Sequence, residues 1–205
     1  LVFLGACSLS FGGLLVKSFE GSTLWQILFW RSVFFILVVT IFLLFSYKRT
    51  IFNVLYKSGI PGVLGGIILS VGFASYVFAM YETTVANTNF IIQTQTLFLA
   101  LFGYFFLKEK ISNSTIFSIL LAMIGVIIMV GNSLSPGQLG GNLVAFLMPI
   151  SFAVLIITVR KYPSIDMVPL QLIAGVVAMV IGYLISGKIN ISMNDIFIGF
   201  LAGFF

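Results

Sequence analysis

The sequence predicts an all-α fold, a polytopic bundle of transmembrane helices in which five-helix units form an inverted repeat. Hydrophobic residues make up 60% of the chain and charged residues only 7%, a composition that no water-exposed surface accommodates. Seven apolar runs and the beginning of an eighth follow one another, and most approach the ~20 residues that a helix needs to cross about 30 Å of hydrocarbon. The run at 27–45 is apolar throughout rather than alternating, which favours helices over a β-barrel.

The first four helices are predicted over residues 1–16, 24–47, 60–81 and 85–107. No basic segment precedes the first run and no small-residue cleavage site follows it, so it is interpreted as a helix rather than a signal peptide. Gly21-Ser22 separates the first two helices, and Ser58-Gly59 lies just before the third. The remaining connections in this half are equally short and leave no room for a soluble domain.

The later helices are predicted over residues 115–131, 143–159 and 168–185, with an eighth beginning at residue 196. Asn113-Ser114, the stretch around Ser135-Pro136-Gly137 and Pro163-Ser164 supply the turns between them. Pro149 lies inside the sixth run and predicts a kink, because proline removes a backbone hydrogen bond. Since the last run is incomplete, we expect the chain to be a C-terminally truncated piece containing seven full helices and part of an eighth.

The distribution of basic residues predicts how the bundle is oriented. Alternate loops collect seven of the ten Lys and Arg residues, whereas the other set of loops holds two and Arg31 falls within a span. Because cytoplasmic loops are enriched in Lys and Arg, the first set is placed in the cytoplasm together with the N-terminus. We therefore expect a multi-pass protein of the cell membrane (inner or plasma membrane). The seven are Lys48, Arg49, Lys57, Lys108, Lys110, Arg160 and Lys161.

A weak internal repeat divides the chain into residues 1–135 and 141–205. Leu9-Ser10-Phe11 matches Ile150-Ser151-Phe152, and the segments that follow these two motifs fall on opposite predicted sides of the membrane. Because five is an odd number of helices, the second unit is predicted to be inverted relative to the first. Secondary transporters recurrently have this architecture, with the substrate site near the midplane between the repeats.

Three segments carry a resemblance to a known family: Gly5 to Lys17, Phe29-Trp30-Arg31, and Ala86 to Ser112, which ends in Leu107-Lys108-Glu109-Lys110-Ile111-Ser112. The chain resembles the EamA-type transporters of the drug/metabolite transporter superfamily over essentially its whole length. The resemblance implies ten helices in two five-helix repeats. Many relatives have a proline in the middle of the fourth helix, where this chain reads Gln93-Thr94-Gln95-Thr96, so the proline kink is not carried over.

The fourth helix has a polar face, and its side chains are candidates for binding substrate. Asn89, Gln93 and Thr96 share this face with Ala100 and Gly103 at helical spacing. Such side chains either hydrogen-bond to neighbouring helices or line a cavity for a polar solute, and both interpretations stay open. Ser10 and Ser151 are further candidates, because the repeat would direct both toward a central cavity.

Arg31 is predicted deep in the second helix, where a charged group needs a partner or water. One interpretation is an ion pair with Glu20 or Glu82, and the other is an anion site in which the guanidinium binds a substrate carboxylate or phosphate. Glu82 and Glu20 are thus candidates for ion pairing, and Glu82 is also a candidate for proton coupling.

Several classes of function lack the residues they require. Histidine is absent and Cys7 is the single cysteine, so neither a metal site nor a disulfide is expected. No nucleotide-binding or catalytic motif occurs, which predicts no cofactor and no enzyme activity. The basic residues are scattered between apolar runs, which argues against nucleic acid as a partner.

The sequence therefore predicts a secondary transporter that moves a small polar metabolite, such as an amino-acid-like or other small organic solute, or a drug, by alternating access. Its expected partners are the small-molecule substrate and membrane lipid, and no pattern in the chain sets an oligomeric state. The alternatives are a scaffold or assembly subunit without transport activity and, less favoured, a membrane enzyme. Uptake by the reconstituted protein would separate these classes.

Overall fold

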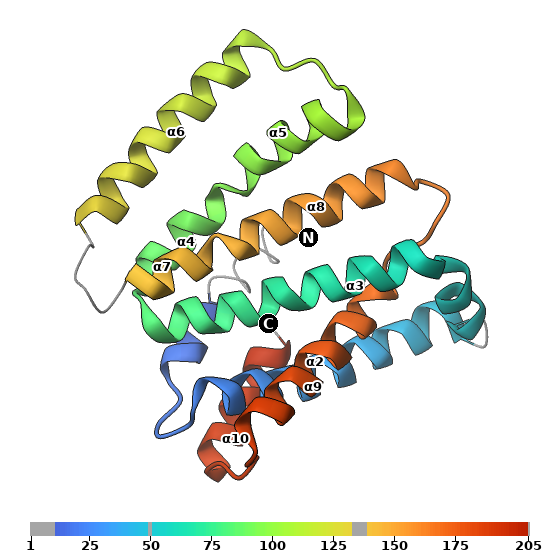
Figure 1. Ribbon diagram of the computed structural model, residues 1–205. Helices are drawn as coiled ribbons and strands as arrows, with labels where there is room; N and C mark the ends of the chain where they lie inside the picture. Colours follow the sequence, from blue (N-terminus) through green and yellow to red (C-terminus); the bar gives the residue numbers. More distant parts are fainter. Residues whose placement is uncertain (1–10, 49–50, 133–138, 205) are drawn as a thin grey trace.

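The computed structural model describes residues 11–48, 51–132 and 139–204, and within these ranges it contains helices and no strand (Figure 1). This confirms the predicted all-α bundle. Residues 11–17 are helical and belong to the predicted first helix, whereas Ser10 lies outside the described residues. The further helices are α2 (Leu24–Tyr47), α3 (Ile51–Glu82), α4 (Val85–Gln93), α5 (Gln95–Leu107), α6 (Asn113–Asn132), α7 (Leu139–Ala145), α8 (Leu147–Lys161), α9 (Leu170–Ser186) and α10 (Met193–Phe204).

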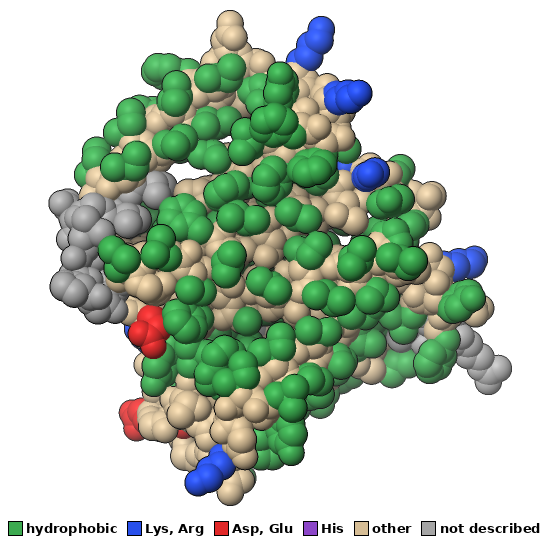
Figure 2. Space-filling view, viewed as in Figure 1, with side chains coloured by type: hydrophobic (Ala, Val, Ile, Leu, Met, Phe, Trp, Pro, Cys, Tyr) green, Lys and Arg blue, Asp and Glu red, His purple; other side chains and the backbone are tan. Residues whose placement is uncertain are grey.

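Helical stretches long and apolar enough to cross a membrane occur four times in the described ranges, at Leu24–Tyr47, Phe52–Glu82, Val85–Leu107 and Leu139–Lys161. Three shorter apolar helices accompany them. The outer surface is largely hydrophobic (Figure 2), with Phe45 81% and Phe52 79% exposed. Such a surface is stable only in contact with lipid, and the fold is therefore that of a multi-pass membrane protein.

Local sequence explains where α2 and α3 begin. Thr23 and Gln26 form a capping box at the start of α2, in which the Thr23 backbone N–H donates to Gln26 Oε1 at 2.8 Å. Gly59 has a φ of 54°, in the left-handed region that favours glycine, and it separates residues 51–58 from the long part of α3. Pro61 follows in the first turn after this break, where its missing N–H costs little. The predicted spans 24–47 and 60–81 agree with this arrangement.

The fourth predicted helix is interrupted, although no proline is present. The regular α-helical pattern is broken at Thr94, whose backbone N–H and Oγ1 both donate to the carbonyl oxygen of Ile91, at 3.0 and 2.6 Å. A hydroxyl that bonds back to its own helix competes with the regular backbone pattern and bends the helix. The single span predicted for 85–107 is thus divided into α4 and α5.

The sixth predicted helix is interrupted where a kink was expected. The break lies at Phe146, three residues before Pro149. Pro149 has no N–H to donate to the carbonyl of Ala145, which is the bond that a continuous helix would contain there. The helix also begins earlier than predicted, at Leu139 rather than residue 143.

The helices pack in a regular order (Figure 1). α2 lies against α9 and α10, α3 lies against α7, α8 and α9, and α5 lies against α8. The largest buried cluster joins α2, α3 and α9 and includes Ile27, Leu28, Val77 and Met80. By contrast, α6 packs only loosely on the outside of the bundle, chiefly against α4.

A close glycine contact joins α3 to α9. A methyl group at Gly66 would lie 2.8 Å from Ile173 Cβ and 3.1 Å from the carbonyl oxygen of Leu170. Only glycine allows the two backbones to approach this closely. The backbone of α3 therefore rests directly on α9.

The same form of contact joins α10 to α2. A methyl group at Gly203 would lie 2.6 Å from Phe34 Cβ and 2.8 Å from the carbonyl oxygen of Arg31. As at Gly66, the glycine meets one carbonyl oxygen and the side chain three positions further along the partner helix. The two contacts thus have the same form, one between α3 and α9 and the other between α10 and α2.

The loops that follow α2, α5 and α8 lie at one end of the bundle (Figure 1). Lys108 and Lys110 lie in the connection after α5, Lys57 lies in the first part of α3, and Arg160 and Lys161 form the last turn of α8. Figure 2 shows most of the visible basic side chains at this end and the visible acidic side chains at the other. We name the first the basic end and the other the acidic end.

Candidate functional site

Arg31 lies in α2 among aromatic side chains. Its Nε donates a hydrogen bond to the carbonyl oxygen of Ala202 in α10, at 3.2 Å. The guanidinium carbon lies 5.0 Å from the centre of the Tyr76 ring and 5.7 Å from the centre of the Phe73 ring, both on α3. Aromatic faces carry partial negative charge, so this position stabilises a cation without a carboxylate.

The ion pair that was one interpretation of Arg31 is not formed. Glu20 and Glu82 are both exposed, and the ion pair found within residues 11–48, 51–132 and 139–204 joins Arg160 to Glu109 at 3.2 Å. Nε is the one guanidinium donor of Arg31 that meets an acceptor in the described part of the chain.

Arg31 also lines a cavity of about 620 Å³ between α2, α3, α9 and α10. This volume is within the roughly 300 to 1,000 Å³ that is typical of small-molecule sites. The walls are mainly apolar and aromatic, with a few polar groups, among them Ser46 and Gln171. Such a lining suits a small organic molecule that has one anionic group, because the guanidinium fixes that group while the walls contact the remainder.

The polar face of the fourth predicted helix lies at a different cavity from Arg31. Gln93 and Thr96 line a separate cavity of about 400 Å³, whose other wall includes Thr115 and Ser118 at α6. Asn89 is exposed and is not part of the lining of either cavity. The structure therefore does not bring this face together with Arg31.

The remaining predicted residues are also spread over the bundle. Ser151 is buried in α8 against α3, where a methyl group at Gly72 would lie 3.3 Å from Ser151 Cβ. Glu82 ends α3, and Glu20 lies in the loop before α2, both at the acidic end. The candidates thus occupy several positions, and Arg31 places a charged group at the wall of the cavity between α2, α3, α9 and α10.

Asp195 is an important buried residue that the sequence analysis did not identify. It is 1% exposed, in the first turn of α10, and accepts hydrogen bonds from Ser22 Oγ at 2.6 Å and from the backbone N–H of Glu20 at 3.1 Å. Its own N–H donates to Ser192 Oγ at 3.1 Å. Ser192 followed by an acidic residue three positions later is a helix-start pattern that could have drawn attention to it. Asp195 ties the loop before α2 to the start of α10.

Comparison with known proteins gives the family. The model of the EamA-like transporter family matches residues 1–131, which is well over half of the chain. A protein of Clostridium kluyveri named "Uncharacterized transporter" is 31% identical over 84 residues, which are 41% of this chain and 27% of that relative. No solved structure matches the chain. The resemblance to the drug/metabolite transporter superfamily agrees with these matches, and this multi-pass helical membrane protein belongs to the EamA-like transporter family.

Proposed function

We propose that the protein is a secondary transporter that moves a small organic solute with an anionic group across the cell membrane by alternating access. The observation that carries this proposal is the position of Arg31, inside the bundle, without a carboxylate partner in the described residues and at the wall of a cavity. Ionisable residues inside membrane proteins most often mark a substrate or ion pathway. A carboxylate or phosphate of the substrate would provide the missing negative charge.

The surroundings of Arg31 support an anion rather than a neutral polar solute. The planar guanidinium presents paired N–H donors that match a carboxylate bidentately. Hydrogen bonding of Nε to the Ala202 carbonyl and the rings of Tyr76 and Phe73 hold the group in place without neutralising it. The substrate would therefore meet an oriented cation in a site of low polarity, where charge-assisted bonds are strong.

Alternating access is supported by the relation between the two halves. The contacts of Gly66 and Gly203 have the same form with the halves exchanged, as expected for inverted repeats over residues 1–135 and 141–205. In such transporters the two units rock against each other around a site between them. The cavity at Arg31 is formed by helices of both units and fits that position.

The distribution of charge supports the membrane orientation that we propose. The basic end holds the loops predicted to be cytoplasmic, which would place the N-terminus in the cytoplasm of the cell. Gln93 and Thr96 would then form a second polar surface facing α6, separate from the cavity at Arg31.

The experiment is uptake of labelled organic anions by the full-length protein in liposomes, after a thermal-shift screen has selected compounds that stabilise it. Arg31→Lys keeps the charge but loses the paired donor geometry. Because a hydrogen bond to a charged group contributes ~1.5 to 3 kcal/mol, we expect uptake to fall at least about tenfold while membrane insertion is preserved. Arg160→Lys is the control, since Arg160 is exposed at the basic end.

Unchanged uptake in Arg31→Lys would reject a bidentate anion site. Absence of uptake for every stabilising compound would instead favour a scaffold or assembly subunit. Chemical conversion of a bound compound would favour the membrane enzyme.

A further inference from the structure

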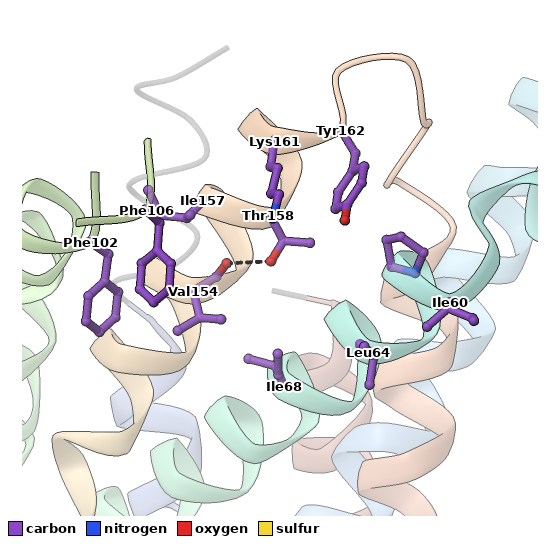
Figure 3. A pocket seen from close by; sticks show the side chains of 11 residues that line it. Ile60, Leu64, Ile68, Phe102, Phe106, Val154, Ile157, Thr158, Lys161 and Tyr162 are labelled. Carbon is purple, nitrogen blue, oxygen red and sulfur yellow. Dashed lines mark hydrogen bonds between the residues drawn. The ribbon is translucent and has the colours of Figure 1, made fainter. Parts of the chain in front are cut away.

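A third cavity, of about 450 Å³, lies between α3, α5 and α8 and extends to the basic end (Figure 3). Ile60 and Leu64 of α3 form one wall, and Phe102 and Phe106 of α5 form the other. Ile157 of α8 lies between them and is only 6% exposed. We name this cavity the α8 groove. It shares no lining residue with the cavity at Arg31.

The walls of the α8 groove are apolar and accessible from outside the bundle. Ile60 is 75% exposed, Leu64 53% and Phe106 66%. Side chains that are this exposed are available for contact with acyl chains. The groove can therefore be entered from the lipid, without passage through the centre of the bundle.

The mouth of the groove carries a cation. Lys161 and Tyr162 lie at one end of the lining and Ile68 at the other (Figure 3), and Lys161 Nζ is 5.9 Å from the centre of the Tyr162 ring. Arg160, the neighbouring cation, is already bound to Glu109 at 3.2 Å. No carboxylate pairs with Lys161 among the residues that the structure describes.

The groove is therefore amphipathic along its length. Val154 lies seven residues before Lys161 on α8, which corresponds to roughly 10 Å along the helix at ~1.5 Å per residue. The charged end of the groove lies where α8 leaves the apolar part of the bundle. The apolar lining of the groove extends from there toward the membrane interior. A molecule that fits this gradient has an anionic head and a hydrocarbon tail parallel to the helices.

We propose that the α8 groove binds an anionic phospholipid of the surrounding bilayer, with one acyl chain between α3 and α5 and the phosphate at Lys161. Lys108 and Lys110 lie in the loop after α5 and add positive charge at the same end. Basic pockets between transmembrane helices bind anionic lipid head groups, and this one combines such a charge with a preformed apolar channel. This inference does not depend on the substrate proposed for Arg31.

The test compares lipid binding by the purified full-length protein in detergent, measured by native mass spectrometry. The two lipids compared are phosphatidylglycerol and phosphatidylcholine with identical acyl chains. Glycerol 3-phosphate, which has a phosphate but no acyl chain, is added as a competitor. We expect phosphatidylglycerol to be retained in preference to phosphatidylcholine, and glycerol 3-phosphate not to compete. Lys161→Gln should reduce the affinity for phosphatidylglycerol about fivefold, equivalent to ~1 kcal/mol for one basic residue near anionic lipid.

Two pairs of variants distinguish binding in the α8 groove from nonspecific attraction of anionic lipid to the protein surface. Lys188→Gln removes an exposed cation from the acidic end and should leave phosphatidylglycerol binding unchanged. Leu64→Trp fills the groove and should displace both lipids, whereas Leu184→Trp, at a position 72% exposed on α9, should not. Lys161→Arg should restore the preference that Lys161→Gln removes.

The proposal is overturned if phosphatidylcholine binds as well as phosphatidylglycerol, if Lys161→Gln and Lys188→Gln have equal effects, or if Leu64→Trp does not reduce binding. Competition by glycerol 3-phosphate would overturn it in favour of a site for a free organic phosphate. Each of these results would leave the Arg31→Lys uptake experiment unaffected, so failure of one proposal is separable from failure of the other.

Discussion

Replacing Gly182 by alanine should destabilise the contact between α2 and α9. The new methyl group would lie 2.9 Å from Phe29 N and 3.0 Å from the carbonyl oxygen of Trp25, and both are backbone atoms that cannot rotate away. Ordinary contact begins at 3.4 Å, so the helices would have to separate by about 0.5 Å (3.4 minus 2.9). Overpacking of this kind costs ~1 to 3 kcal/mol, and the higher helix propensity of alanine offsets about 1 kcal/mol of it.

Gly125→Ala is the matched control, because a methyl group at Gly125 of α6 would meet nothing within 4 Å. The gain in helix propensity is common to both substitutions and cancels in their difference. We therefore expect Gly182→Ala to be ~1 to 3 kcal/mol less stable than Gly125→Ala. The assay is unfolding in mixed micelles followed by tryptophan fluorescence, which Trp25 at the contact should report. Equal free energies of unfolding would refute the close packing of α2 on α9.

Three further predictions concern charged and aromatic groups. Asp195→Asn should lower the free energy of unfolding by ~1 to 3 kcal/mol, measured by thermal denaturation, because the amide NH₂ would face a donor where the carboxylate now accepts two hydrogen bonds. Glu109 and Arg160 should show a coupling energy below about 1 kcal/mol in a double-mutant cycle, since both side chains are about half exposed and salt screens them. Tyr76→Leu should destabilise the protein by ~1 to 2 kcal/mol beyond Tyr76→Phe, because only the latter keeps a ring against Arg31.

Each of these predictions has an outcome that contradicts it. Glu82→Gln changes an exposed carboxylate at the same end as Asp195, and an equal effect of the two would remove the special role of Asp195. A coupling energy between Glu109 and Arg160 that does not fall in high salt would show that their pair is shielded from solvent. Equal stability of Tyr76→Leu and Tyr76→Phe would show that the ring does not stabilise the guanidinium.

Local signals allowed most helix boundaries to be predicted. The bounds of α2 were predicted from a long apolar run after the Gly21-Ser22 turn, and the structure adds the Thr23 cap. The start of the long part of α3 follows Gly59, whose backbone conformation few other residues adopt. The break before Pro149 was predictable because proline lacks a donor. The break at Thr94 was not, because the direction in which a threonine hydroxyl donates depends on competing bonds of similar energy.

The environment of the candidate site could be predicted only in part. The depth of Arg31 in an apolar run was enough to predict that its positive charge needs a partner or water. Its partners were not predictable, because the acceptor belongs to Ala202, far along the chain, and the rings belong to α3. Helical periodicity likewise identified a polar face around Gln93 but carries no information on which neighbour that face meets.

The two interrupted helices differ in what would be needed to straighten them. In α7 and α8 the missing donor is a covalent property of Pro149, so no rearrangement of the bundle can supply it. In α4 and α5 every residue around Thr94 retains its N–H, and the bend depends on a hydroxyl that can rotate to another acceptor. Because α5 packs directly on α8, the interruption at Thr94 and the interruption before Pro149 lie in neighbouring helices. Of the two interruptions, the one at Thr94 is therefore the one that could be straightened without a change in covalent structure.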